Sequence, residues 1–191
     1  MLYVPSGYRA GRPSPLVVLL HGAGAEARGI LPVFRDAAEA EGLVVLAPTS
    51  REYTWDVIVG GYGPDVRAID GALERTFSRY AVDPARVAVA GFSDGASYAL
   101  SLGITNGDLF RRVLALSPGF MAPAGRVGSP RFYVSHGTRD AVLPIERCSR
   151  TIVPRLERSG YGVRYREFDG GHEVPPEVMR EAGDWLAAGE D

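Results

Sequence analysis

The chain has 191 residues, of which 46% are hydrophobic and 23% charged, and its formal net charge at pH 7 is −2. This length is typical of one globular domain, so we expect a single domain over residues 1–191. The small net charge gives no electrostatic basis for binding nucleic acid or anionic lipid. No apolar run reaches membrane-spanning length, and residues 1–5 lack the regions of a signal peptide. We therefore expect a cytoplasmic protein that binds neither nucleic acid nor membranes.

Apolar runs alternate with amphipathic stretches along the whole chain. The apolar runs are short and mostly continuous, as in buried parallel strands, and they lie at residues 16–20, 43–47, 87–90, 113–116, 132–134 and 163–168. The amphipathic stretches have apolar residues at three-to-four spacing, which predicts helices at residues 26–41, 64–80, 96–102, 145–159 and 176–186. Residues 2–4 indicate one short further edge strand. This alternation predicts an α/β fold with a doubly wound, mostly parallel sheet.

A serine stands at the centre of a glycine-flanked turn between a predicted strand and a predicted helix. Residues 91–95 read Gly-Phe-Ser-Asp-Gly, with Ser93 in the middle. Such a turn strains the serine backbone, and a side chain at Gly91 or Gly95 would collide with the neighbouring strand or helix. A chance turn in a glycine-rich chain is the alternative. The flanking strand and helix favour a nucleophile elbow with Ser93 as the nucleophile.

A serine hydroxyl needs a neighbouring base, and that base needs a carboxylate to orient it. Candidate groups follow several predicted strands, whose carboxyl ends meet at one edge of a parallel sheet. His172 comes last in the chain, in a Gly-Gly-His turn, and is our predicted general base. Asp140 follows the strand at 132–134 and is our predicted orienting acid. His21 and His136 are expected to brace their loops by hydrogen bonds.

Two other acidic residues near His172 are rivals for the role of the acid. Asp169 and Glu173 lie too near His172 in sequence to approach the far nitrogen of its ring easily, so we interpret them as turn and helix-start residues. Asp94 is adjacent to the nucleophile and is expected to point elsewhere, as a carboxylate at a helix N-terminus.

The oxyanion formed during ester hydrolysis must be met by preorganised N–H donors. We expect one from the backbone of Asp94, the residue after the nucleophile, and a second from Ala23 in the glycine loop at residues 21–24. An alternative interpretation is that residues 22–27 form a dinucleotide-binding fingerprint of the G-x-G-x-x-A type. It is disfavoured because the elbow, the acid and the terminal histidine would then all be coincidences.

Together, residues 21–24 (His-Gly-Ala-Gly), residues 91–95, residues 136–140 with Pro144, and Gly171-His172 resemble the phospholipase/carboxylesterase family of α/β-hydrolases, which is related to acyl-protein thioesterases. The resemblance covers nearly the whole chain. It implies a Ser-Asp-His triad in this order, no metal, no organic cofactor, and hydrolysis of carboxylic esters or thioesters. Cys148 is the only cysteine, so neither a disulfide nor a thiol-based zinc site is available within the chain.

The chain also departs from the family pattern. Acyl-protein thioesterases usually have glutamine after the nucleophile, whereas Asp94 stands here, which favours a general carboxylesterase. Trp55 resembles a tryptophan in a loop beside the family's acyl pocket, although a packing role explains it equally well. The opening segment is short, so we expect the antiparallel first strand of the fold to be reduced or missing.

These features predict a serine carboxylesterase, a monomer or homodimer, acting on small-molecule esters. Residues 117–130 are too few for a cap domain, so we expect an open cleft with Trp55, Phe120 and Met121 contacting the acyl chain. Such a cleft favours esters with roughly two to eight acyl carbons. The alternatives are a thioesterase or lysophospholipase-type hydrolase, and an acyltransferase or perhydrolase with the same triad. A ligand-binding pseudoenzyme is disfavoured because all three triad residues are present.

Overall fold

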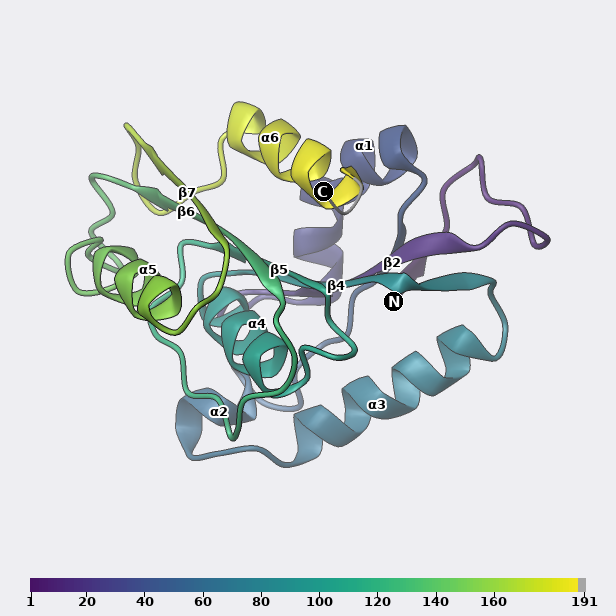
Figure 1. Cartoon of the computed structure of the whole chain (residues 1–191), viewed down its shortest axis with the longest axis horizontal. Coiled ribbons are helices and arrows are strands. Elements are labelled where there is room, and N and C mark those ends of the chain that lie inside the picture. The colour runs from purple at the N-terminus through teal and green to yellow at the C-terminus, as the bar shows by residue number, and fades with distance from the viewer. Residues whose placement is uncertain (189–191) are drawn as a thin grey trace.

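In the computed structural model, residues 1–188 are described and build one seven-stranded sheet with helices on both faces (Figure 1). The strands are β1 (Leu2–Tyr3), β2 (Ser14–Leu20), β3 (Val44–Leu46), β4 (Val82–Phe92), β5 (Arg112–Leu116), β6 (Arg131–Gly137) and β7 (Val163–Phe168). Their order in the sheet is β1-β3-β2-β4-β5-β6-β7, and only the pairing of β1 with β3 is antiparallel. The last three residues of the predicted 1–191 domain, 189–191, lie outside the described part.

The helices are divided between the two faces of the sheet (Figure 1). They are α1 (Ala27–Glu41), α2 (Asp56–Val59), α3 (Pro64–Phe77), α4 (Asp94–Thr105), α5 (Ser149–Arg158) and α6 (Pro176–Ala187). Helices α1 and α6 pack side by side on one face, and the other four lie on the opposite face. The connection at residues 117–130 contains no helix, so no cap covers the sheet edge there. The predicted doubly wound α/β fold without a cap is confirmed.

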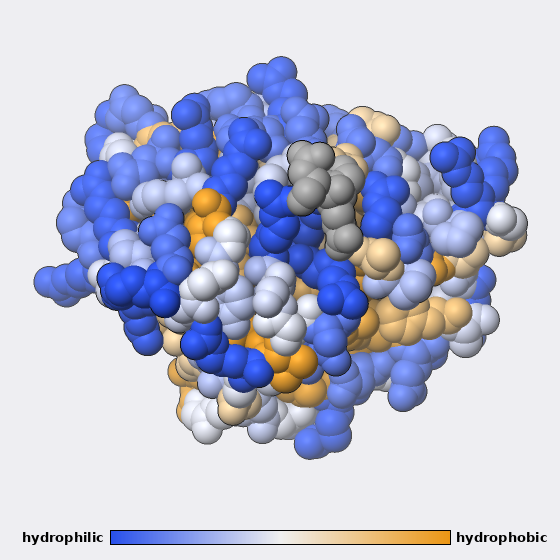
Figure 2. Space-filling view, viewed as in Figure 1, coloured by the Kyte–Doolittle hydropathy of each residue, from blue (hydrophilic) through white to orange (hydrophobic). Residues whose placement is uncertain are grey.

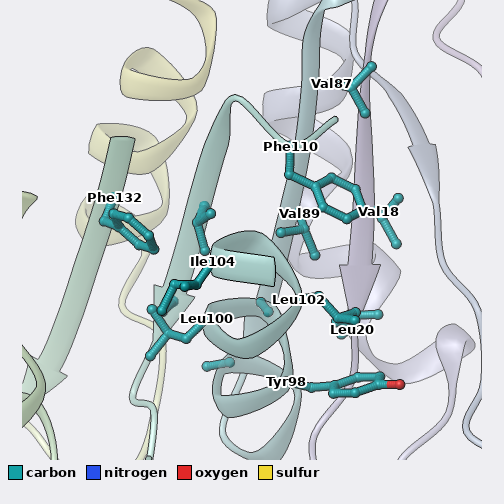
Figure 3. Packing of buried hydrophobic residues seen from close by; sticks show 14 of the residues in the cluster. Val18, Leu20, Val87, Val89, Tyr98, Leu100, Leu102, Ile104, Phe110 and Phe132 are labelled. Carbon is teal, nitrogen blue, oxygen red and sulfur yellow. The ribbon is translucent and has the colours of Figure 1, made fainter. Parts of the chain in front are cut away.

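Each face of the sheet has its own apolar core, which explains why the strands read as continuous apolar runs. Side chains of a strand alternate between the two faces. In β2, Val18 and Leu20 pack against α4 (Figure 3), whereas Val17 and Leu19 pack under α1 and α6. Because both faces are covered, the strands β2, β3 and β5 are buried along nearly their whole length. The double core fixes the carboxyl ends of the strands, where the candidate residues lie.

The element boundaries differ from the predicted ones in a few places. Helix α3 ends at Phe77 rather than at residue 80. At this end the hydroxyl of the next residue, Ser78, donates a hydrogen bond to Arg75 O. Helix α5 begins at Ser149, because residues 144–148 form separate turns. Helix α2 was not predicted, since one turn of helix is too short to show a periodicity. Strand β1 is reduced to two residues, as the short opening segment predicted.

The surface is mainly polar. In Figure 2 hydrophilic side chains dominate the visible face, and the apolar groups form small separate patches. Within residues 1–188, no helix has both the length and the apolar character that a membrane span requires.

Candidate active site

Ser93 lies in the sharp turn between β4 and α4. Its backbone has φ 57° and ψ −121°, a strained conformation for a residue with a side chain. A Cβ atom at Gly91 would overlap the carbonyl of Gly95. A Cβ atom at Gly95 would in turn overlap the Leu20 carbonyl at the end of β2. The strained turn and the need for both glycines, predicted from the sequence, are confirmed.

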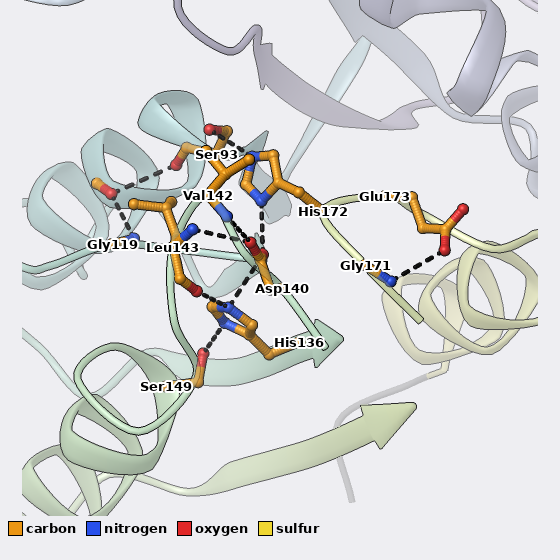
Figure 4. Close-up of polar contacts among 11 residues, drawn as sticks. Ser93, Gly119, His136, Asp140, Val142, Leu143, Ser149, Gly171, His172 and Glu173 are labelled. Carbon is orange, nitrogen blue, oxygen red and sulfur yellow. Dashed lines mark hydrogen bonds and ion pairs between the residues drawn. The ribbon is translucent and has the colours of Figure 1, made fainter. Parts of the chain in front are cut away.

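The structure brings Ser93, His172 and Asp140 together in one line of hydrogen bonds (Figure 4). His172 Nδ1 lies 2.6 Å from Asp140 Oδ2, and His172 Nε2 lies 2.9 Å from Ser93 Oγ. An ionised carboxylate only accepts hydrogen bonds, so Nδ1 carries the proton and Nε2 is free to accept one from the hydroxyl. This is the tautomer that a general base beside a serine requires. The Phe92 ring, with its centroid 4.8 Å from that of the imidazole, supports His172 from one side.

The Asp140 carboxylate is buried and accepts several hydrogen bonds. Its Oδ1 accepts the backbone N–H groups of Val142 and Leu143, at 2.9 and 2.8 Å. Burial by itself raises the pKa of Asp140, but the hydrogen bonds from Leu143 and His172 outweigh it and hold that pKa below its usual value. The carboxylate therefore stays charged at neutral pH, with its orientation fixed by the turn at residues 140–143.

A second histidine, His136, lies on the other side of the Asp140 carboxylate (Figure 4). Its Nε2 lies 2.8 Å from Leu143 O and 3.2 Å from Asp140 Oδ2, so this nitrogen donates. Its Nδ1 accepts from the Ser149 hydroxyl at 2.7 Å. Burial lowers the pKa of His136, so the ring is neutral. His136 thus braces the loop of the acid, as expected from the sequence.

The two rival acids have other partners. Asp169 forms an exposed ion pair with Arg139, and Glu173 accepts the backbone N–H of Gly171 at 3.1 Å. In the described part of the chain, neither makes a hydrogen bond to His172. Asp94 points away from the imidazole and accepts the Thr54 hydroxyl at 2.6 Å.

The glycine loop after β2 passes directly beside the nucleophile, since a Cβ atom at Gly22 would lie 3.3 Å from that of Ser93. Buried His21 fixes this loop. Its Nε2 accepts the Ser50 N–H at 3.0 Å, and its Nδ1 donates to Gly22 O at 2.8 Å. A trans peptide points its N–H away from its carbonyl, so His21 also orients the N–H of Ala23.

Two backbone N–H groups near Ser93 have no acceptor within residues 1–188. They belong to Ala23 and to Asp94, the first residue of α4. Unsatisfied N–H groups in such a position, one of them at a helix N-terminus, suit a developing negative charge.

The structure corrects the expectation that Trp55 contacts the acyl chain. Its side chain is 0% exposed and packs in the core between the rings of His21 and Tyr98, with centroid distances of 4.8 and 5.2 Å. The indole N–H donates to His21 O at 2.8 Å. Trp55 therefore supports the glycine loop through this hydrogen bond. Its side chain stays in the core and does not reach the cleft.

A cleft of about 530 Å³ opens beside Ser93 and His172. Its apolar walls were not predicted from the sequence and are formed by Ile30, Val33, Phe92, Val142 and Val174. Val142 and Val33 are unusually exposed for apolar residues, at 66% and 39%. Phe120 and Met121 are half-buried on the 117–130 loop and do not line this cleft. The exposure of Val142 and Val33 cannot be predicted from the sequence, because in the sequence they resemble ordinary loop and helix residues.

The parallel sheet, the elbow and the hydrogen-bonded serine, histidine and aspartate are those of an α/β-hydrolase. The family model of Phospholipase/Carboxylesterase matches residues 66–189, and the chain belongs to this family. It is a serine hydrolase that acts on carboxylic ester bonds. The matched range includes Ser93, Asp140 and His172 but not the glycine loop.

Several known proteins are similar to this chain. Feruloyl esterase C of Emericella nidulans is 29% identical over 92% of this chain and 76% of its own length. The crystal structure of esterase PE8 has a TM-score of 0.75 with 24% identity, covering 97% of both chains. The carboxylesterase of Bacillus cereus has a TM-score of 0.75 with 17% identity, over 97% of this chain and 92% of its own. At these identities the two structures establish the fold alone.

Proposed function

We propose that the protein hydrolyses short to medium chain carboxylic esters through a Ser93-His172-Asp140 triad and an acyl-enzyme. The observation that carries this proposal is the 2.9 Å contact between His172 Nε2 and Ser93 Oγ, with the same ring held by Asp140 through its other nitrogen. We further propose that it acts in the cytoplasm on small-molecule esters, as a monomer or homodimer, without a metal or an organic cofactor.

In the proposed first step, Ser93 Oγ attacks the ester carbonyl carbon and its proton passes to His172 Nε2. The carbonyl oxygen becomes an oxyanion, which accepts hydrogen bonds from the Ala23 and Asp94 N–H groups. When the intermediate collapses, the bond to the alcohol oxygen breaks and His172 gives its proton to that oxygen. Asp140 stabilises the imidazolium in between, and its lowered pKa supports this role.

Water completes the cycle in the proposed mechanism. It attacks the acyl-enzyme carbonyl while His172 accepts its proton, and the tetrahedral intermediate then releases the carboxylic acid as the proton returns to Ser93 Oγ. The oxyanion donors and the triad therefore serve both steps. Because the connection between β5 and β6 forms no cap within residues 1–188, water has access to the acyl-enzyme, which favours hydrolysis over transfer to another acceptor.

The test is the esterase rate of the Ser93→Ala variant, with Ser129→Ala as the control. Ser129 is exposed on the loop before β6, away from the cleft. On p-nitrophenyl butyrate, Ser93→Ala should lower kcat by about 10⁵-fold or more, because triad members act as a unit. Ser129→Ala should match the wild type. A Ser93→Ala variant that keeps a substantial fraction of the activity would overturn the proposal.

Esters of hydroxycinnamic acids are a second candidate substrate class. Feruloyl esterase C of Emericella nidulans and the probable feruloyl esterase C of Aspergillus oryzae each align with 92% of this chain. The apolar cleft walls near Ser93, which include an aromatic ring at Phe92, suit a flat aromatic acyl group. Comparing kcat/KM for methyl ferulate and ethyl butyrate distinguishes the two classes. A higher value for methyl ferulate would select the aromatic acids and would replace the proposed preference for aliphatic acyl groups.

A further inference from the structure

A second apolar hollow adjoins the cleft, and it lies between α1 and α6. We call it the α1/α6 groove; its volume is about 650 Å³ and its apolar lining is Val33, Ala37, Ala40, Val174, Met179 and Gly183. Val33 and Val174 also line the cleft beside Ser93, so the two hollows share a wall. Helices α1 and α6 run side by side over this face of the sheet (Figure 1).

Small residues make the groove. The two helices lie close together at Gly183 and Ala37, where a Cβ atom on the glycine would lie 3.1 Å from that of the alanine. Ala40, one turn further along α1, is exposed. From Val33 to Ala40 the helix rises about 10 Å. The groove is therefore long enough for an alkyl chain, and it begins at the residues that it shares with the cleft.

The direction of the groove indicates which part of an ester it can hold. The leaving oxygen must lie beside His172 Nε2, which protonates it. Val174, two residues after His172, forms the junction between cleft and groove. The oxyanion points instead to the glycine loop. An alcohol chain that starts at His172 passes Val174 and enters the groove.

Charge along the groove restricts its occupant. Asp36, Glu41 and Asp184 line the groove, with Arg180 as the one cationic side chain among the described lining residues, and Glu41 and Asp184 lie toward the C-terminal ends of α1 and α6. An anionic group such as a phosphate or carboxylate would meet this excess of negative charge, whereas an uncharged chain would not.

We propose that the α1/α6 groove is the binding site for the alcohol part of the ester, and that this part is an uncharged, extended apolar chain. The inference rests on the proposed function, because it takes His172 as the group that protonates the alcohol. It adds a substrate preference on the leaving-group side, about which the sequence predicts nothing.

The test compares kcat/KM for butyrate esters of alcohols of increasing length. The reaction is measured by titration of the released acid. A fully buried methylene raises the binding constant about fourfold, and a methylene covered on one side raises it about twofold. Hexyl butyrate has four more methylenes than ethyl butyrate, so its kcat/KM should be higher by a factor on the order of ten. A terminal carboxylate on the hexyl chain should remove most of this gain, because it would lie among the acidic residues that line the groove.

The variant Ala40→Phe obstructs the groove. A helical side chain leans toward the N-terminus of its helix, so a phenyl ring at residue 40 covers the trough over Ala37. It should reduce the hexyl-to-ethyl ratio of kcat/KM from about tenfold to about twofold. The matched control is Ala68→Phe on α3, which lies on the opposite face of the sheet and should keep the tenfold ratio.

A parallel series with a fixed ethyl group and acyl chains of increasing length distinguishes the two sides of the ester. Its chain-length dependence should be the same in Ala40→Phe and in the wild type. If Ala40→Phe changes the acyl series instead, or changes neither series, the inference is wrong while the triad proposal stands. If the wild type hydrolyses no ester and Ser93 is inert, both proposals are wrong.

Discussion

Replacing His21 by phenylalanine should lower kcat strongly and the free energy of unfolding only moderately. The two hydrogen bonds of this ring link Ser50 N–H to Gly22 O, and Gly22 O belongs to the same peptide as the Ala23 N–H. Phenylalanine keeps an aromatic ring against Trp55 but cannot make either bond. Among residues 1–188, the one hydrogen bond left to the peptide that offers the proposed oxyanion donor would be that from Ala25 N–H, at 3.2 Å from Gly22 O.

The size of the expected fall in kcat follows from the loosening of one oxyanion donor. Removing an oxyanion donor outright costs about 10²- to 10³-fold in kcat, so loosening one should cost about 10- to 100-fold. The free energy of unfolding should fall by about 1–3 kcal/mol, because the Ser50 N–H loses its acceptor. The variant His21→Asn offers the contrast: its amide can still donate to Gly22 O, but the ring and the acceptor for Ser50 are gone.

The assay measures kcat and KM on p-nitrophenyl butyrate and unfolding in urea for both variants. We expect His21→Phe to have the lower kcat and His21→Asn the lower stability, with KM changing little in His21→Phe. If the loss of kcat follows the loss of stability in both variants, or if His21→Phe retains full kcat, then His21 does not orient the Ala23 peptide.

Three further predictions concern the acid, the second histidine and the substrate. Asp140→Asn should lower kcat by up to about 10⁴-fold, because the asparagine disturbs the tautomer of His172. The pKa of His136 is lowered in the folded state, so its contribution to stability is complete above about pH 6.5 and is lost as the pH falls through the folded pKa. Urea unfolding between pH 7 and 5 should therefore show a smaller loss of stability in His136→Gln than in the wild type, and an equal loss would contradict the assignment. On tributyrin, the rate should show no jump at the solubility limit, because the loop at 117–130 provides no lid; a sharp rise there would reveal one.

Much of the fold could be predicted because both faces of the sheet are covered. A buried parallel strand shows as an apolar run, and the run predicted at residues 113–116 lies within β5, Arg112–Leu116. Helix α2 and the late start of α5 could not be predicted, since a single turn and a series of turns leave no periodic signal. These elements depend on side-chain to backbone hydrogen bonds, such as Asp56 N–H to Asp65 Oδ2 at 2.9 Å.

The candidate site was predictable where chain order and sheet topology determine it. Ser93, Asp140 and His172 each follow a strand, and parallel strands bring such positions to one edge. The apolar walls depend instead on how α1 and the loop at 172–175 pack over that edge. Val33 and Val174 therefore look like surface and loop residues in the sequence. Trp55 is the opposite case, a residue predicted to line the cleft that does not. In the sequence a loop tryptophan looks available for a ligand, and only its packing against Tyr98 shows that it is buried.

The most direct test of the central claim is to find which residue a fluorophosphonate probe modifies. The wild type should be labelled once, and mass spectrometry of the digested protein should locate the adduct on Ser93. Asp140→Asn and His172→Ala should label much more slowly, because the hydroxyl loses its activation, while Ser129→Ala should label at the wild-type rate. An adduct on another serine, or labelling of Ser93 that does not depend on His172, would contradict the triad.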